Sequence, residues 1–351
     1  MRFGRRDRGS SSRTFCSGIA SDAGVSPVRH TIASLSDEYH LSRDPVLAAR
    51  LLKLRHRAFI DMPCEPARTW PPTHRDPFPG ARGLLPQIHA EELTTELLGG
   101  AIQHHGCLPV RALLSPEQVA LVRSDLALAF DACEAARGAS TDANPSTRYQ
   151  PFEAEPGYVR INRGERQWVE RCGGVWAADS PPALCDVIDL FHQLDVPEVV
   201  GGYLGEPPAL SVNKCTLRRV GPEAYPSWHQ DGAFLGKGVR SVDVWIALTA
   251  CGEGTDAPGL GIAPRRIDRL LPTGTAGAMV EHSIGEPEVI RALDGLEPVY
   301  PHFEPGDALL FDELFVHCTG MRPGLTGQRE ALETWLFTPS TFPPDYVPLV
   351  I

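Results

Sequence analysis

The second half of the chain, from Leu210 onward, is a series of short apolar segments separated by glycine and proline. Many short strands that end at such turn signals are typical of a β-sandwich or a jelly roll. We expect eight strands, at Leu210–Val220, Ser227–Asp231, Val242–Thr249, Leu260–Pro264, Glu297–Phe303, Ala308–Phe311, Leu314–His317 and Ala331–Phe337.

Helical signals are concentrated before Leu210. Asp44-Pro45 predicts a helix start, with an N-cap residue and a proline in the first turn, and the helix should run to about Ile60. Ser115-Pro116-Glu117-Gln118 predicts a capping box. Helices before the strands would pack on the outside of one sheet. Further elements are expected as helices at Glu91–Leu98 and from Ser180-Pro181 and as strands at Cys107–Leu114 and Tyr158–Asn162.

The chain divides into an N-terminal extension, residues 1–88, and a main domain, residues 89–351. The first twenty residues are rich in arginine and serine, and Asp7 is their only acidic residue. That composition fits an organelle transit peptide, but a disordered tail or an upstream start is the favoured interpretation. After the helix that starts at Pro45, the segment from Pro63 to Pro86 is dense in proline and should form a wrapping loop or linker.

Charge and cysteine content narrow the class of protein. A formal net charge of −11 and a pI near 5.6 argue against nucleic acid or an anionic membrane surface as partners. The nine cysteines are odd in number and include no C-x-x-C pair, which indicates reduced thiols and a cytoplasmic location. No apolar run approaches the roughly 18 residues of a membrane span.

Two His-x-Asp patterns occur, at His74 and Asp76 and at His229 and Asp231. Chance supplies about one such pair in a chain of this composition, so context has to separate them. Residues i and i+2 of a strand point to the same face, which lets His229 and Asp231 chelate one ion, whereas the other pair lies in the proline-rich loop. With His317, they make the two-histidine, one-carboxylate set that suits non-haem Fe(II). The alternative is a partly buried histidine and a turn aspartate.

Arg329 lies twelve positions after His317, just before the last apolar strand. Its planar guanidinium can bind a carboxylate through two hydrogen bonds, and an oxygenase that uses 2-oxoglutarate needs such a clamp. The alternative interpretation is an ordinary surface arginine.

Taken in order, several segments resemble the phytanoyl-CoA dioxygenase family of Fe(II)/2-oxoglutarate-dependent oxygenases. The resemblance implies a double-stranded β-helix of the jelly-roll or cupin-like type, within an α+β, mainly β fold whose flanking helices pack on one sheet. It covers the chain from about residue 89 to the C-terminus. The segments are Trp228-His229-Gln230-Asp231, Val244-Trp245-Ile246-Ala247-Leu248, Gly259-Leu260-Gly261-Ile262-Ala263-Pro264, Glu304-Pro305-Gly306-Asp307 and His317-Cys318-Thr319, followed by Arg329.

The resemblance also implies roles for individual residues. His229, Asp231 and His317 would be the iron ligands, and Arg329 would hold 2-oxoglutarate. Further residues at the site would be Thr319, adding a hydroxyl to the same carboxylate, Trp245 near the iron and Arg218 as a basic residue lining the pocket. The loops at Asp256-Ala257-Pro258-Gly259 and Pro264-Arg265-Arg266 depart from the family pattern, so the substrate does not follow from the resemblance.

The implied activity is that of an Fe(II)/2-oxoglutarate-dependent dioxygenase, which uses O2 to hydroxylate a small molecule and releases succinate and CO2. A carboxylate at Asp231 favours hydroxylation or desaturation, because halogenation needs that ligand position for a halide. The substrate could be anionic, and the protein is expected to be a monomer or homodimer. Two alternatives stay open: a non-catalytic ligand-binding member of the fold, and an iron enzyme that does not use 2-oxoglutarate.

Overall fold

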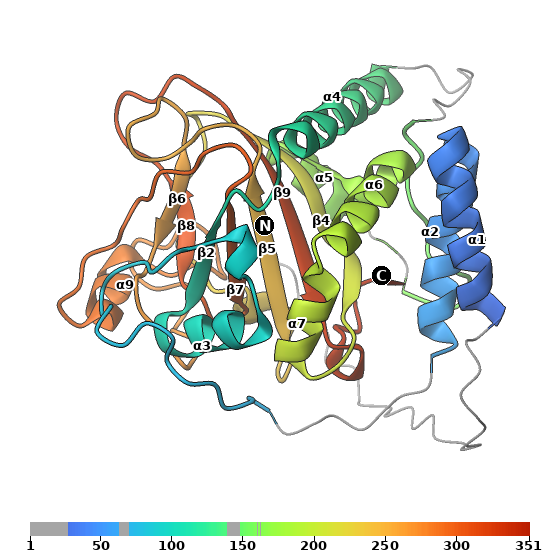
Figure 1. Ribbon diagram of the computed structural model, residues 1–351. Coiled ribbons are helices and arrows are strands. Elements are labelled where there is room, and N and C mark those ends of the chain that lie inside the picture. Colours follow the sequence, from blue (N-terminus) through green and yellow to red (C-terminus); the bar gives the residue numbers. More distant parts are fainter. Residues whose placement is uncertain (1–26, 63–69, 139–147, 160, 162) are drawn as a thin grey trace.

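The computed structural model describes residues 27–62, 70–138, 148–159, 161 and 163–351. The predicted transit peptide or tail therefore lies outside the described residues. Helices dominate the first half of the chain, with short strands between some of them, and strands dominate the second half (Figure 1). The α-helices are α1 (Pro27–Ser42), α2 (Pro45–Ile60), α3 (Thr95–His105), α4 (Pro116–Gly138), α5 (Arg163–Arg171), α6 (Pro181–Gln193), α7 (Val196–Leu204), α8 (Gly232–Leu235) and α9 (Glu286–Leu293).

The predicted helix starts are confirmed in atomic detail. The Asp44 carboxylate accepts a hydrogen bond of 2.9 Å from the backbone N–H of Val46, and Pro45 opens helix α2. At the start of α4, the N–H of Gln118 donates to the Ser115 hydroxyl while the N–H of Ser115 donates to the Gln118 side chain. This reciprocal pair is the predicted capping box. Helix α6 begins at Pro181, as its Ser-Pro start predicts.

Helices α1 and α2 pack against the rest of the protein. Leu51 and Leu52 on α2 are 1% and 0% exposed and belong to the same apolar cluster as residues of the large sheet. The neighbours of α2 are α6 and strand β10 (Pro348–Val350). Residues 70–87 form neither helix nor strand, as their prolines predict. Within the described residues, no helix is both long and apolar enough to cross a membrane.

The core of the fold is one large sheet facing a small one. The large sheet has the order β1-β2-β7-β5-β9-β4-β10, with β3 beside β4, and the small sheet pairs β6 with β8 (Figure 1). The remaining strands are β1 (Ile88–His89), β2 (Cys107–Arg111), β3 (Gly174–Trp176), β4 (Ala209–Val220), β5 (Ser241–Ala247), β6 (Gly259–Ile262), β7 (Ala308–Asp312), β8 (His317–Gly320) and β9 (Arg329–Phe337).

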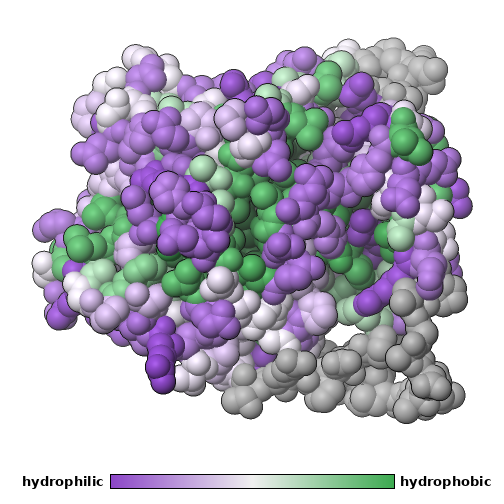
Figure 2. Space-filling view, viewed as in Figure 1, coloured by the Kyte–Doolittle hydropathy of each residue, from purple (hydrophilic) through white to green (hydrophobic). Residues whose placement is uncertain are grey.

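The two faces of the large sheet follow from side-chain alternation. On β5, Val242, Val244 and Ile246 pack with the helices, whereas Trp245 and Ala247 pack with apolar residues of the small sheet. The arrangement is a double-stranded β-helix with helices covering the outer face of one sheet, which confirms the predicted fold class. Hydrophilic residues cover most of the surface seen in Figure 2, with apolar residues visible between them near its centre.

Several predicted elements are wrong in detail. Ser227–Asp231 is not a strand: His229 makes one isolated bridge to His317, and Asp231 has a helical backbone, with φ −63° and ψ −33°, as the cap of α8. Glu297–Phe303 likewise forms isolated bridges only. The strand predicted at Leu314–His317 begins at His317 instead, because residues 312–315 form a turn closed by the N–H of Phe315 and the carbonyl of Asp312.

Two predictions near the helices are also wrong. The helix expected at Glu91–Leu98 is a short 3-10 turn at Ala90–Glu92, and α3 starts afresh at Thr95, where the Thr94 side chain caps it. Tyr158 and Val159 are not in a strand, because they follow a turn at Gly157, whose φ is +90°. Arg160 and Asn162, the other polar positions of that prediction, lie outside the described residues.

Candidate metal centre

Three side chains converge at the edge between the sheets. One ligand atom from each of His229, Asp231 and His317 lies within 4.8 Å of the other two, the only such histidine, cysteine and carboxylate group among the described residues. Two backbone hydrogen bonds join the histidines: the N–H of His229 donates to the carbonyl of His317 at 2.9 Å, and the reverse bond measures 3.1 Å. The bridge places distant segments of the chain at one point.

Both histidines are oriented by backbone carbonyl groups. Nδ1 of His229 lies 2.8 Å from the carbonyl oxygen of Ser227, and Nδ1 of His317 lies 3.2 Å from that of Phe315. A proton on each Nδ1 satisfies these contacts and leaves the Nε2 lone pairs for a metal ion. Burial lowers the pKa of His229 to about 4 and that of His317 well below its ordinary value, so both rings are neutral at pH 7.

Asp231 completes the set with a buried carboxylate. Its Oδ1 lies 3.6 Å from Nε2 of His229 and has no hydrogen-bond partner, and the residue is 2% exposed. Burial raises the pKa of this carboxyl group well above its ordinary value. A buried carboxylate oxygen without a donor is costly unless a cation meets it.

The backbone after Asp231 has little space for another side chain. The N–H of Gly232 donates to the carbonyl of Glu313 at 2.8 Å. A Cβ at Gly232 would lie 3.0 Å from that same oxygen and 2.9 Å from Leu270 Cδ2. Glycine therefore lets the chain turn into α8 directly beside the segment that leads to His317.

Aromatic rings enclose the histidines. The rings of Phe311 and Phe315 lie 4.7 and 5.8 Å from the ring of His317, and Phe234 stacks 6.5 Å from His229. The side chain of His229 is 27% exposed, compared with 2% for Asp231, so the centre opens on the His229 side. His282 lies at this opening, with its ring 5.3 Å from that of Phe234.

Arg329 lies buried at the first position of β9. Its Nη1 donates to the carbonyl groups of Pro258 and Gly259, its Nε has no hydrogen-bond partner, and the residue is 2% exposed. Across the described residues, no carboxylate pairs with it within 4.0 Å. The alternative interpretation of Arg329 as a surface residue is therefore wrong, and its guanidinium retains donor capacity for an anion.

Strand β8 connects the metal ligands to the arginine. His317 begins the strand, and Gly320 at its other end pairs with Gly259, whose carbonyl accepts from Arg329. Three residue steps of strand span about 10 Å. Thr319 shares the face of His317 because it lies two positions further along.

Trp245 and Arg218 have contacts that the resemblance alone did not specify. The guanidinium carbon of Arg329 lies 5.4 Å above the Trp245 ring, whose indole nitrogen is buried and unpartnered, so Trp245 lies beside the arginine. Arg218 forms a 2.8 Å salt bridge with Glu333 and donates to the carbonyl of Cys172. Its charge is thus already balanced by the protein, and its predicted role at the pocket stays a prediction.

Lys214 is a residue near the site that the sequence interpretation missed. Its Nζ lies 4.6 Å from the ring centres of Phe234 and Trp335 and 5.2 Å from that of Tyr346. Phe234 is also the ring that stacks on His229, so Lys214 lies near the metal ligands. The available signal was alternation, because Lys214 and Arg218 are four positions apart on one strand and share a face.

The second His-x-Asp pair is used elsewhere. Asp76 accepts hydrogen bonds of 2.8 Å from both His105 Nε2 and the N–H of Phe78, and the N–H of His74 donates to the Gln103 side chain. His104 and His105 are the last residues of α3. These contacts attach the loop to α3, away from the metal centre.

The residues present fit a divalent iron ion. Two neutral imidazoles with free Nε2 atoms and one carboxylate with an unpartnered oxygen are the donor set that binds non-haem Fe(II) while leaving coordination positions open. The backbone contacts at both Nδ1 atoms are the second layer that such sites use to fix ring orientation.

Comparisons with known proteins gave matches among solved structures only. Neither protein-family models nor curated protein sequences gave a match. Similar solved structures include EctD from S. alaskensis with 2-oxoglutarate and 5-hydroxyectoine, at 14% identity and TM-score 0.49, covering 78% of this chain and 83% of that one. AviO1 from Streptomyces viridochromogenes Tue57 has 16% identity and TM-score 0.44, over 72% and 98% of the two chains.

A third similar structure is SnoK, a non-haem α-ketoglutarate-dependent carbocyclase from nogalamycin biosynthesis. It has 15% identity and TM-score 0.45, and the match covers 71% of this chain and 85% of that chain. At these identities and TM-scores, no conclusion about this chain rests on the likeness. The chemistry of the site rests on the residues described above.

Proposed function

We propose that this protein is an Fe(II)/2-oxoglutarate-dependent dioxygenase, similar to the phytanoyl-CoA dioxygenase family, that hydroxylates a small-molecule substrate. The observation that carries the proposal is the convergence of His229, Asp231 and His317 within 4.8 Å, with the Asp231 Oδ1 buried and unpartnered. Iron bound there would supply the oxidative chemistry, in which a C–H bond, 2-oxoglutarate and O2 give C–OH, succinate and CO2.

The protein's own residues would hold and shield the reactants. The two Nε2 atoms and the Asp231 carboxylate would bind the iron on one side, and the guanidinium of Arg329 would bind the far carboxylate of 2-oxoglutarate. Thr319 would donate its hydroxyl to that carboxylate. Phe234, Phe311 and Phe315 would restrict the access of water around the histidines.

The cation at Lys214 supports a negatively charged ligand on the open side of the centre. Its Nζ faces three aromatic rings, and no carboxylate among the described residues pairs with it within 4.0 Å. An anionic group of the substrate or co-substrate would meet this charge. We therefore extend the proposal to a small-molecule substrate that carries a carboxylate or phosphate.

The test is metal binding combined with 2-oxoglutarate turnover. We expect the purified protein to bind one Fe(II) per chain under anaerobic conditions and, once O2 is added, to release succinate from 2-oxoglutarate. His229→Ala and Asp231→Ala should abolish both results. The matched control is His74→Ala, which removes the histidine of the other His-x-Asp pair and should leave both intact. Equal iron binding in all the variants would overturn the metal centre.

A separate outcome distinguishes the alternatives left open by the sequence. A protein that binds iron at His229 and Asp231 but neither binds nor consumes 2-oxoglutarate would be an iron protein of another kind. That result would overturn the co-substrate while leaving the metal ligands in place.

A further inference from the structure

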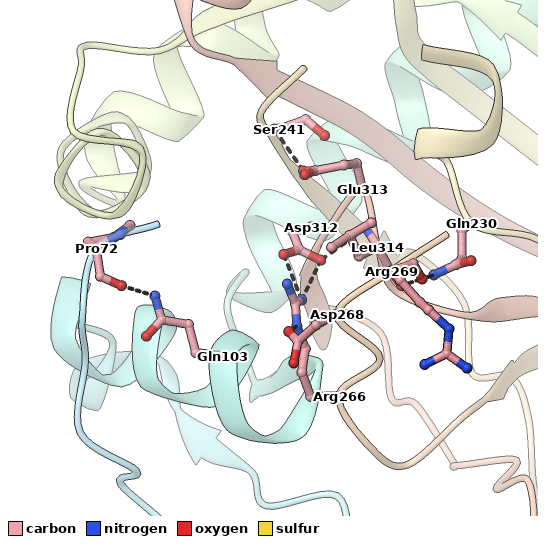
Figure 3. A network of polar contacts seen from close by, with 10 residues as sticks. All are labelled: Pro72, Gln103, Gln230, Ser241, Arg266, Asp268, Arg269, Asp312, Glu313 and Leu314. Carbon is pink, nitrogen blue, oxygen red and sulfur yellow. Dashed lines mark hydrogen bonds and ion pairs between the residues drawn. The ribbon is translucent and has the colours of Figure 1, made fainter. Parts of the chain in front are cut away.

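The side chain of Gln230 lies between the two metal ligands in sequence but points away from them. Its Nε2 donates to the carbonyl groups of Arg269 at 2.9 Å and Leu314 at 2.6 Å. Its Oε1 accepts from the N–H of Leu271 at 2.7 Å. One amide group therefore binds the loop at residues 269–271 and the turn at residues 312–315 together (Figure 3).

A second contact reaches the same turn from Arg266, three residues before Arg269. Nη1 of Arg266 lies 2.8 and 2.7 Å from the two carboxylate oxygens of Asp312, as Figure 3 shows. Asp312 in turn accepts a hydrogen bond of 3.1 Å from the N–H of Leu314. The carbonyl that Gln230 contacts therefore belongs to a turn that Asp312 already shapes.

A glutamine amide matches this position in both size and hydrogen-bonding capacity. Gln230 is 0% exposed, and both of its donor contacts and its acceptor contact are made by protein backbone groups. A glutamate of the same size would offer no N–H and would face two carbonyl oxygens. A methionine would fill the volume and leave all three backbone groups unpaired.

The turn bound by Gln230 leads directly to the third metal ligand. His317 follows Leu314 by three residues, and the carbonyl of Glu313 accepts from the N–H of Gly232, next to Asp231. The contacts of Gln230 and Gly232 thus hold the His229-Asp231 segment against the segment of His317. We propose that Gln230 is a positioning residue, which sets the separation of the metal ligands before any ion binds; this inference rests on the proposed metal centre.

The experiment measures iron binding rather than turnover. Fe(II) is titrated anaerobically into the wild-type protein, Gln230→Glu and Gln230→Met, and binding is followed by calorimetry. Loss of a group that orients metal ligands typically weakens metal affinity by about 10- to 100-fold, so both variants should show a dissociation constant raised by that factor. The visible spectrum of the Co(II)-loaded protein should also change, because it reports the geometry of the ligands.

Gln103 offers a matched control. Its side-chain amide also joins backbone groups of a loop, donating to the carbonyl of Pro72 and accepting from the N–H of His74 at 3.0 Å, but Figure 3 shows it apart from Gln230. Gln103→Glu and Gln103→Met should lower the melting temperature without changing the Fe(II) dissociation constant or the Co(II) spectrum.

The outcomes separate the two levels of inference. If the wild-type protein fails to bind Fe(II), the proposed function is wrong. If the wild-type protein binds Fe(II) and Gln230→Met binds it equally well with an unchanged Co(II) spectrum, the positioning role of Gln230 is wrong. If the buried charge prevents Gln230→Glu from folding, the test rests on the Fe(II) affinity and Co(II) spectrum of Gln230→Met.

Discussion

Replacing Arg329 by methionine should remove 2-oxoglutarate binding while leaving iron binding in place. The guanidinium is 2% exposed, and only its Nη1 contacts backbone carbonyl groups, those of Pro258 and Gly259. The Nε–H is unpartnered. The side of the guanidinium that includes Nε can therefore donate two hydrogen bonds to the far carboxylate of 2-oxoglutarate. Strand β8 fixes the distance between this guanidinium and His317.

The expected magnitude follows from the number of donors. A hydrogen bond that involves a charged group contributes about 1.5–3 kcal/mol, so two such bonds contribute about 3–6 kcal/mol. At about 1.4 kcal/mol per factor of ten, Arg329→Met should raise the dissociation constant of 2-oxoglutarate by roughly 10² to 10⁴. Arg329→Lys keeps the charge but loses the planar fork, so its loss should be smaller.

The assay is anaerobic calorimetric titration of 2-oxoglutarate into the Fe(II)-loaded protein. Arg322→Met is the matched control, because Arg322 also donates to backbone carbonyl groups, those of Gly252 and Thr255, but lies exposed on the surface. The affinity of Arg322→Met for 2-oxoglutarate should equal that of the wild type. An unchanged dissociation constant in Arg329→Met would refute the clamp.

Three further predictions concern stability. A divalent metal at 100 times its dissociation constant should stabilise the wild type by about 2.7 kcal/mol, or roughly 4 °C in melting temperature, and should not shift His317→Ala in a thermal scan. Burial lowers the pKa of His229 to about 4. The unfolded chain therefore binds more protons than the folded one as the pH falls from about 6.5. Between pH 6.5 and 5, the free energy of unfolding of the metal-free protein, measured with urea, should fall by about 1–2 kcal/mol more in the wild type than in His229→Gln. An equal fall in the two proteins would contradict this. Leu52→Ala should cost about 2–5 kcal/mol in the same assay, because Leu52 is 0% exposed in the main apolar cluster; a loss below about 1 kcal/mol would show that α2 is only loosely attached.

The division of the chain at residue 88 remains a prediction, and the packing of α2 bears on it. Composition alone suggested an appendage, because a proline-rich segment follows the helix. The apolar face of α2 instead packs in the cluster that includes the helix-covered face of the large sheet. The partner of an amphipathic face is a long-range property, which periodicity within the helix does not specify.

Two of the errors in the predicted strands share one cause. The segments at Ser227–Asp231 and Glu297–Phe303 were predicted as strands, but each pairs with another segment only through isolated bridges. Whether an extended segment becomes a strand depends on a partner that continues the ladder. Asp231 lies beside His229 although it is the cap of helix α8 and not part of a strand, so the strand alternation used to predict the pair does not apply.

The sequence by itself determined the residue types of the centre, two histidines, one aspartate and one arginine, and the alternating strands that make a two-sheet fold. Those features are local, since ligand chemistry and side-chain alternation are properties of short segments. Only the tertiary structure decided that His229 and Asp231 meet His317 from a bridge and a helix cap, that Lys214 lies near the metal ligands, and that Gln230 joins two loops behind them. Each depends on contacts between segments far apart in the chain, and irregular loops carry no periodic signal from which such contacts could be predicted.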